Sequence, residues 1–298
     1  MNIYYTDTFE LPLPDGHRFP IDKYRLLRLA LLERGIVARP HLLQSLPADP
    51  ALVMTAHDPD YVRAVLDGSL DRRVQRRIGL PWSPGFVTRT LASVGATIEA
   101  SRSALYHGFG AALSGGTHHA FRDFGEGYCV FNDVVVAIAV LRREGRARRP
   151  AVIDLDVHQG NGTAAMLEND PEAYTLSIHG AGNFPFRKYP STRDVDLPDG
   201  CGDADYLAAL APELERVAAF APDIIYYQAG VDVIREDALG RLALSIDGVA
   251  RRDRMVGELA QRLGVPLVMT MGGGYAKPIT RTVEAHCAGH AVMQELYG

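Results

Sequence analysis

The chain has 298 residues, of which 47% are hydrophobic and 22% are charged. This is the composition of an ordinary globular protein with a sizeable core, so a disordered or fibrous chain is excluded. The formal net charge of -5 argues against a surface that binds nucleic acid.

The cysteines and the first residues bear on cellular location. Cys129, Cys201 and Cys287 form neither a CxxC motif nor an even framework, so no disulfide scaffold is expected. The chain does not start with a basic segment followed by an apolar one, and no stretch of about 18 apolar residues occurs. We expect a soluble, cytoplasmic protein with no membrane partner.

The predicted elements alternate along most of the chain. Before residue 90 only Ile21 to Arg34 has clear helical periodicity, ended by Gly35, and the rest is predicted as helix and loop. Further helices are predicted over 93–106, 132–144, 203–220, 248–263 and 278–296. Strands are predicted over 109–113, 151–155, 174–178, 223–228 and 266–270. This alternation indicates an α/β fold, a single open and mostly parallel sheet flanked by helices on both faces, in one domain spanning 1–298.

Ionisable or glycine-rich segments follow four of the predicted strands. They cover residues 114–119, 156–158, 229–232 and 271–275. In open α/β sheets, ligands bind beyond the carboxyl ends of the strands. The sequence therefore predicts a functional site built from these four segments.

Asp154, Asp156 and His158 stand at alternate positions at the end of strand 151–155. Alternate side chains of an extended segment share a face, so Asp156 and His158 can approach one ion with Asp154 behind them. Such a set suits Zn²⁺ or Fe²⁺ better than Ca²⁺ or Mg²⁺. A catalytic site needs a third protein ligand, and Asp232 is the best candidate. The alternative is a helix N-cap beside a surface histidine.

A tandem pair, His118 and His119, follows a Gly-Gly turn that lets both side chains face one pocket. Asp154 and Asn161 could each orient one of these imidazoles through Nδ1. In an arbitrary pair, one histidine would be buried and the other would lie at the surface.

Three consecutive glycines, 272–274, precede Tyr275. They lack the lysine and the spacing of a phosphate or dinucleotide loop, and they favour a sharp turn close to a ligand. Tyr275 would then offer an O–H donor to a developing oxyanion. A buried core tyrosine is the alternative.

Together these motifs resemble the zinc-dependent histone deacetylase family, which has an arginase/deacetylase-like α/β fold. The resemblance covers nearly the whole chain and is closest to the compact class IV-like and bacterial members. The matching segments follow the family's order: 17–20, 115–120, 127–133, 154–158, 229–232 with Asp237, and 272–275.

The resemblance implies a hydrolase that removes acyl groups from acyl-lysine in a protein or peptide, or from a small acylated amine. His119 would be the general acid and base, His118 its electrostatic partner and Tyr275 the donor to the transition state. Asp156, His158 and Asp232 would bind Zn²⁺. The substrate channel would be lined by Gly127, Tyr128, Phe184 and Gly273, with Phe186 as a second candidate for its aromatic wall.

Two further implications concern polar partners. The family's structural potassium site would correspond to Asp154, Asp156, His158, Ser177 and Ile178, mostly through backbone carbonyls. Some members have an aspartate where this chain has Asn161. Because an amide does not raise the basicity of an imidazole as a carboxylate does, His119 should be a weaker base here.

Three other functions are alternatives to this one. An acetylpolyamine or small-amide hydrolase of the same fold would use the same residues, but an acidic, narrowed mouth would favour it and no dedicated insertion is evident. A ureohydrolase with two Mn²⁺ would need further bridging aspartates, where this chain has Gln159. Loss of the tyrosine or the tandem histidines would favour a non-catalytic, metal-stabilised protein that binds acyl-lysine, and neither is lost.

Overall fold

The computed structural model describes residues 1–298 and contains one eight-stranded sheet. All neighbouring strands are parallel, in the order β2-β1-β3-β8-β7-β4-β5-β6. The strands are β1 (Asn2–Tyr5), β2 (Leu42–Gln44), β3 (Phe109–Ala112), β4 (Pro150–Asp154), β5 (Tyr174–Gly180), β6 (Arg193–Leu197), β7 (Ile224–Gln228) and β8 (Leu267–Thr270). The predicted parallel α/β fold is confirmed.

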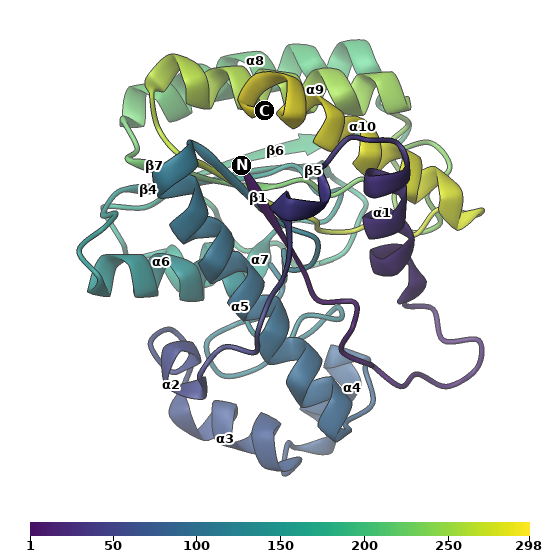
Figure 1. Ribbon diagram of the computed structural model, residues 1–298, viewed down its shortest axis with the longest axis vertical. Coiled ribbons are helices and arrows are strands. Elements are labelled where there is room, and N and C mark those ends of the chain that lie inside the picture. The colour runs from purple at the N-terminus through teal and green to yellow at the C-terminus, as the bar shows by residue number, and fades with distance from the viewer.

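Helices cover both faces of the sheet (Figure 1). One layer contains α1 (Asp22–Glu33), α8 (Asp203–Phe220), α9 (Ile246–Leu263) and α10 (Ile279–Tyr297). The other contains α5 (Pro84–His107), α6 (Asp133–Arg143) and α7 (Asn161–Leu167). Shorter helices lie near the first half of α5: α2 (Pro50–Val53), α3 (Pro59–Asp67) and α4 (Arg72–Ile78), while the 3-10 turn η1 (Arg39–His41) precedes β2. None of the helices is long and apolar enough to span a bilayer.

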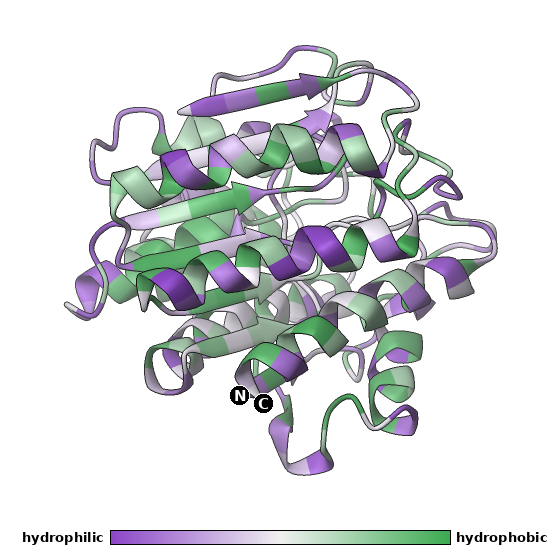
Figure 2. Cartoon of the chain, turned by 90° about the horizontal axis from the view of Figure 1, so that it is seen from above, coloured by the Kyte–Doolittle hydropathy of each residue, from purple (hydrophilic) through white to green (hydrophobic).

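The hydrophobic core is split in two by the sheet. Adjacent residues of one strand point to opposite faces, so Val152 and Tyr226 pack into one cluster while Ile153 and Tyr227 pack into the other. The central strands are accordingly apolar along their length, whereas the helices carry polar residues on their outer sides (Figure 2). Since both faces of the sheet are covered, ligands can reach it at the carboxyl ends of its strands.

Helix ends follow the capping signals of the sequence. Asn132, the first residue of the helix predicted over 132–144, accepts a hydrogen bond from the Val135 amide at 3.1 Å and caps the start of α6. Helix α5 begins nine residues before its predicted start, at Pro84, because Ser83 caps it by accepting from the Phe86 amide and the proline suits the first turn.

Three strands were missed by the sequence prediction. Strands β1 and β2 lie in the region predicted as helix and loop, and they are only four and three residues long. Strand β6 is an edge strand of sequence RDVDL, whose charges hide the alternating pattern of a buried strand. Charged residues are common on edge strands because they discourage pairing with other chains.

A buried arginine joins the ends of two central strands. Arg252, on α9, is fully buried and donates from Nη1 to the carbonyls of Leu155, just after β4, and Gly230, just after β7, at 3.1 and 2.7 Å. The adjacent Asp253 accepts from Arg252 Nε at 2.8 Å and from the Tyr227 hydroxyl. Arg252 therefore holds together the segments that carry the predicted metal ligands.

Replacing Arg252 with alanine should lower the free energy of unfolding by about 3–5 kcal/mol, because Asp253 would be left buried without its counter-charge. Urea unfolding followed by circular dichroism measures this change. Arg254→Ala is the control, since Arg254 pairs with Glu295 at the surface and should change stability by at most about 1 kcal/mol. Equal losses in the two variants would contradict the structural role of Arg252.

Candidate active site

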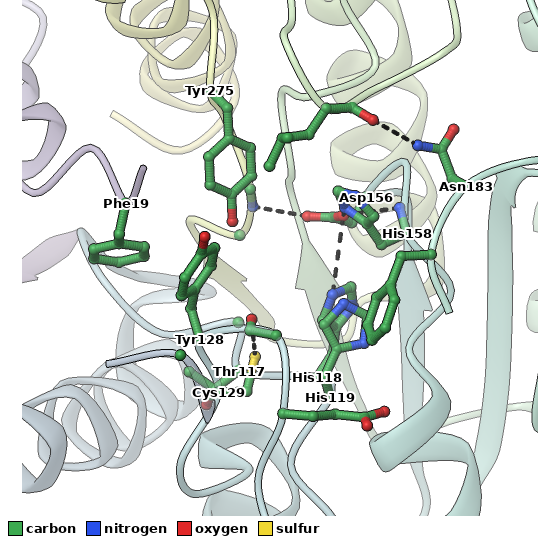
Figure 3. A pocket seen from close by; sticks show the side chains of 18 of the residues that line it. Phe19, Thr117, His118, His119, Tyr128, Cys129, Asp156, His158, Asn183 and Tyr275 are labelled. Atoms are coloured by element: carbon green, nitrogen blue, oxygen red, sulfur yellow. Dashed lines mark hydrogen bonds and ion pairs between the residues drawn. The ribbon is translucent and has the colours of Figure 1, made fainter. Parts of the chain in front are cut away.

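A cavity of about 680 Å³ opens beyond the carboxyl ends of the central strands (Figure 3). Strands β3, β8, β7 and β4 are consecutive neighbours in the sheet, so the segments that follow them converge. The cavity is lined by parts of three of those segments, 115–119 after β3, Asp156 and His158 after β4, and 272–275 after β8. The structure thus brings together most of the residues predicted for the site.

The three predicted metal ligands meet at the inner end of this cavity. His158 Nδ1 lies 3.0 Å from Asp156 Oδ1 and 3.1 Å from Asp232 Oδ2. A backbone amide holds the second oxygen of each carboxylate, from Gly273 to Asp156 Oδ2 at 2.7 Å and from Val157 to Asp232 Oδ1 at 2.9 Å. One atom from each of the three side chains therefore points to a common centre.

This donor set fits a zinc ion. The three ligand atoms lie within 4.8 Å of one another, and all three residues are buried. Two carboxylate oxygens and one imidazole nitrogen, with an open side toward the cavity, form a typical three-ligand catalytic zinc site. The site also needs glycine nearby, because a Cβ on Gly230 would lie 2.3 Å from Asp156 Oδ2 and one on Gly273 would lie 1.8 Å from Asp232 Oδ2.

The tandem histidines lie side by side next to this centre, with ring centroids 4.1 Å apart. His118 Nδ1 is 2.7 Å from Asp154 Oδ2, and His119 Nδ1 is 2.7 Å from Asn161 Oδ1. Both side chains face the cavity, as expected for a Gly-Gly turn rather than a strand. Each imidazole thus has a different partner, a carboxylate for His118 and an amide for His119.

The pKa values of the two histidines are shifted in opposite directions. Burial lowers the pKa of His118, but the carboxylates of Asp154 and Asp156 outweigh it and raise that pKa to about 9. Burial and the neighbouring His118 and His158 hold the pKa of His119 well below its usual value. The shifts favour the charged form of His118 and the neutral form of His119.

Tyr275 lies across the cavity from the histidines (Figure 3). Its backbone amide donates to Asp237 Oδ2 at 2.6 Å, which fixes the turn after the three glycines. Burial raises the pKa of Tyr275 well above its usual value, and Asp232 and Asp156 act in the same direction. The phenol therefore keeps its proton and remains a hydrogen-bond donor.

A buried lysine of the cavity was missed by the sequence reasoning. Lys23 on α1 is buried, donates to the Gly272 carbonyl at 3.1 Å and lies 5.1 Å from the centroid of the Tyr275 ring. Burial lowers its pKa to about 8, although Asp232 and Asp156 oppose the shift. The sequence contains a sign that Lys23 is buried, because Lys23 lies on the inward-facing side of α1 with Leu27, four residues further along.

The predicted channel residues Gly127, Tyr128, Phe184 and Gly273 all line the cavity. The Tyr128 backbone has φ of 67°, unusual for a bulky residue, and its amide is held by the Ile78 carbonyl at 2.8 Å. The Phe184 ring lies edge-on to His119 with centroids 5.0 Å apart, whereas the other aromatic candidate, Phe186, is 86% exposed.

The potassium site stays a prediction. Of its implied ligands, Asp154 and Ser177 lie opposite one another on β4 and β5, with Ile178 following. Both carboxylate oxygens of Asp154 already have partners, His118 and, at 3.2 Å, the Asp156 amide. An ion would therefore depend mainly on backbone carbonyls, as the resemblance implies.

Comparison with known proteins gives consistent results. The sequence model of a protein family, described as the histone deacetylase domain, matches residues 17–290. An uncharacterized protein of Picosynechococcus is 43% identical over 99% of this chain and 98% of its own length. A histone deacetylase-like amidohydrolase of Pseudomonas aeruginosa is 30% identical over 96% of this chain and 78% of its own length. The crystal structure of an HDAC homolog from Aquifex aeolicus superposes with a TM-score of 0.81 at 22% identity, over 97% of this chain and 83% of that one.

Gly273→Ala should abolish stable zinc binding, because the new methyl group would displace the Asp232 carboxylate from the common centre. Zinc per chain, measured by atomic emission after dialysis, should fall from about one to near zero if the three-ligand site is correct. Gly202→Ala is the control, since a Cβ there meets nothing closer than 3.9 Å. Full zinc retention in Gly273→Ala would contradict the ligand geometry.

Proposed function

The chain belongs to the histone deacetylase family, and we propose that it removes acyl groups from the Nε atom of acyl-lysine by zinc-dependent hydrolysis. Membership assigns the chain to the deacetylase and amidohydrolase enzymes. Acyl-lysine as substrate and zinc as metal are our proposals. They rest on one observation, the convergence of a three-ligand centre, two adjacent histidines and a tyrosine on one cavity.

Asp156, His158 and Asp232 would hold the metal. When bound, a zinc ion supplies Lewis acidity toward the acyl carbonyl and the attacking water. The backbone amides of Gly273 and Val157 keep both carboxylates in place, so the ligands are oriented before any ion arrives. Fe²⁺ would suit the same set of donors.

The remaining steps are assigned to three side chains. His119 is neutral, and its Nε2 makes no hydrogen bond within the protein, so it takes the proton of the attacking water and later returns a proton to the leaving amine. His118 stays charged and stabilises the negative charge that develops nearby. Tyr275 donates its O–H to the tetrahedral oxygen.

The lining of the cavity favours acyl-lysine over acetylpolyamine. Phe19, Tyr128 and Phe184 supply apolar walls suited to the aliphatic stem of lysine. The exposed charged residues that line the cavity are arginines, Arg76, Arg77 and Arg241. A polyamine keeps several positive charges outside the scissile amide, and Arg76 would repel it, since Arg76 lacks the carboxylate partner that Arg77 and Arg241 have.

We also propose that residues 1–298 act as one catalytic domain, because the sheet includes strands from β1 near the start of the chain to β8 at residue 270. Segments far apart in the sequence, from Lys23 to Tyr275, line the same cavity. A cytoplasmic location stays a prediction.

The substrate proposal is tested by a panel of acetyl-lysine peptides, longer acyl-lysine peptides and acetylpolyamines, assayed on one preparation of known zinc content. We expect turnover of at least one acyl-lysine peptide, with kcat/KM roughly tenfold or more above that of any acetylpolyamine, equivalent to about 1.4 kcal/mol of discrimination. Turnover of acetylpolyamine without turnover of any acyl-lysine peptide would overturn the choice of substrate.

Tyr275→Phe should reduce kcat by roughly 10²–10³-fold while zinc stays bound, since one donor to the oxyanion is lost and no metal ligand is touched. The matched control is Tyr106→Phe, because Tyr106 is 73% exposed and its hydroxyl contacts only Arg146. If Tyr275→Phe keeps its activity within a few-fold, the tyrosine does not act as the oxyanion donor.

A further inference from the structure

A line of hydrogen bonds leads from His119 to the protein surface. Beyond the His119–Asn161 contact, Asn161 Nδ2 donates to Glu126 Oε1 at 2.8 Å. Glu126 Oε2 accepts from Arg77 Nη2 at 2.6 Å. The Glu126 side chain is only 12% exposed, while that of Arg77 is 51% exposed at the wall of the cavity. Neither Glu126 nor Arg77 has a role in the reaction proposed above.

Glu126 decides which way the Asn161 amide faces. A carboxylate paired with arginine can only accept hydrogen bonds, so it must face the NH₂ group of Asn161. The amide oxygen then faces His119, and an oxygen accepts only from a protonated nitrogen. His119 Nδ1 must therefore carry the proton, which leaves the lone pair on Nε2.

We propose that Glu126, anchored by Arg77, is a positioning residue that fixes His119 in the tautomer needed to accept a proton at Nε2. The inference rests on the proposed function, since it concerns the residue assigned there as the base. Glu126 acts through Asn161 and makes no hydrogen bond to a metal ligand.

Arg77, which anchors Glu126, is itself held in place by further contacts. The Arg77 guanidinium lies over the Phe124 ring, 4.3 Å from its centroid. The Arg77 carbonyl accepts from the Gly127 amide at 3.1 Å, which ties the loop after Glu126 to the end of α4. Side chain and backbone of one residue therefore hold the carboxylate in place.

The same contacts explain why an amide stands at position 161. An aspartate there would place two carboxylates in contact, because the present distance between the two side chains is 2.8 Å. Two such charges strongly disfavour each other in a buried site. Glu126 and Asn161 are thus a matched pair of acceptor and donor, whereas His118 is held directly by the carboxylate of Asp154.

Glu126→Gln tests the proposal without changing the shape of the side chain. Arg77 would attract the new amide oxygen, so the NH₂ group of glutamine would face Asn161 and turn its amide over. His119 Nδ1 would then meet a donor and lose its proton to Nε2. We expect kcat to fall roughly tenfold or more with KM changed less than about twofold, since a wrong histidine tautomer in a catalytic triad costs as much as about 10⁴-fold.

The tautomer can be measured directly by ¹⁵N NMR on protein labelled at histidine, because protonated and unprotonated imidazole nitrogens resonate far apart. His119 is assigned as the signal missing in His119→Ala. In the wild type Nδ1 should be protonated, and in Glu126→Gln Nε2 should be. Asp123→Asn, the same change of charge in the same loop on an exposed residue, should leave the tautomer and kcat unchanged.

Exchanging the acceptor and donor roles of Glu126 and Asn161 should restore the hydrogen bonds that orient His119. Asn161→Asp alone should lose activity through repulsion with Glu126. In the double variant Glu126→Gln with Asn161→Asp, glutamine donates to aspartate and aspartate accepts from His119 Nδ1, so kcat should exceed that of either single variant by roughly fivefold or more. If Glu126 had only a structural role, the losses of activity in the two single variants would add in the double variant.

The outcomes separate this inference from the proposed function. If the wild type turns over no acyl amide, the proposed function fails, while the ¹⁵N spectra still show whether Glu126 sets the tautomer. The inference itself is overturned if His119 keeps its proton on Nδ1 in Glu126→Gln, or if the double variant is no more active than the weaker single variant.

Discussion

The structure depends on burying three carboxylates, Asp154, Asp156 and Asp232, at the ends of two adjacent parallel strands. An ionised carboxylate without partners is costly in a protein interior, so each must be compensated. Asp154 has a charged histidine and an amide, and the other two have backbone amides and His158. The cluster is therefore electrostatically suited to a divalent cation without a change of fold.

Much of the surrounding structure serves this arrangement. Because β4 and β7 are neighbours, Asp156 and Asp232 start close together, and Arg252 fixes the backbone of both segments from the helical layer behind them. Gly230 and Gly273 leave the space that the carboxylates need. The same strand order brings the tandem histidines after β3 and Tyr275 after β8 to the walls of this cavity.

The two histidines show how one buried contact can assign different tasks to identical side chains. A carboxylate partner raises the pKa of His118, whereas burial and the neighbouring His118 and His158 lower the pKa of His119, whose own partner is an amide. The amide in turn faces a carboxylate and an arginine at the edge of the cavity. In this arrangement, the ring nitrogen of His119 that carries the proton is set by groups that extend from the site to the surface where substrate would enter.

The sequence by itself determined the parallel α/β fold, the strand ends that carry the site and most of its residues, because these follow from local periodicity and from motifs read along the chain. It predicted α8 from Asp203 to Phe220 at its observed bounds and missed β6, whose charged residues reflect its place at the edge. Lys23, Glu126 and Arg252 were not identified as parts of the site. Only the tertiary structure decided their roles, because each acts through partners 22 to 249 residues away, and such contacts depend on strand order and packing rather than on neighbouring sequence.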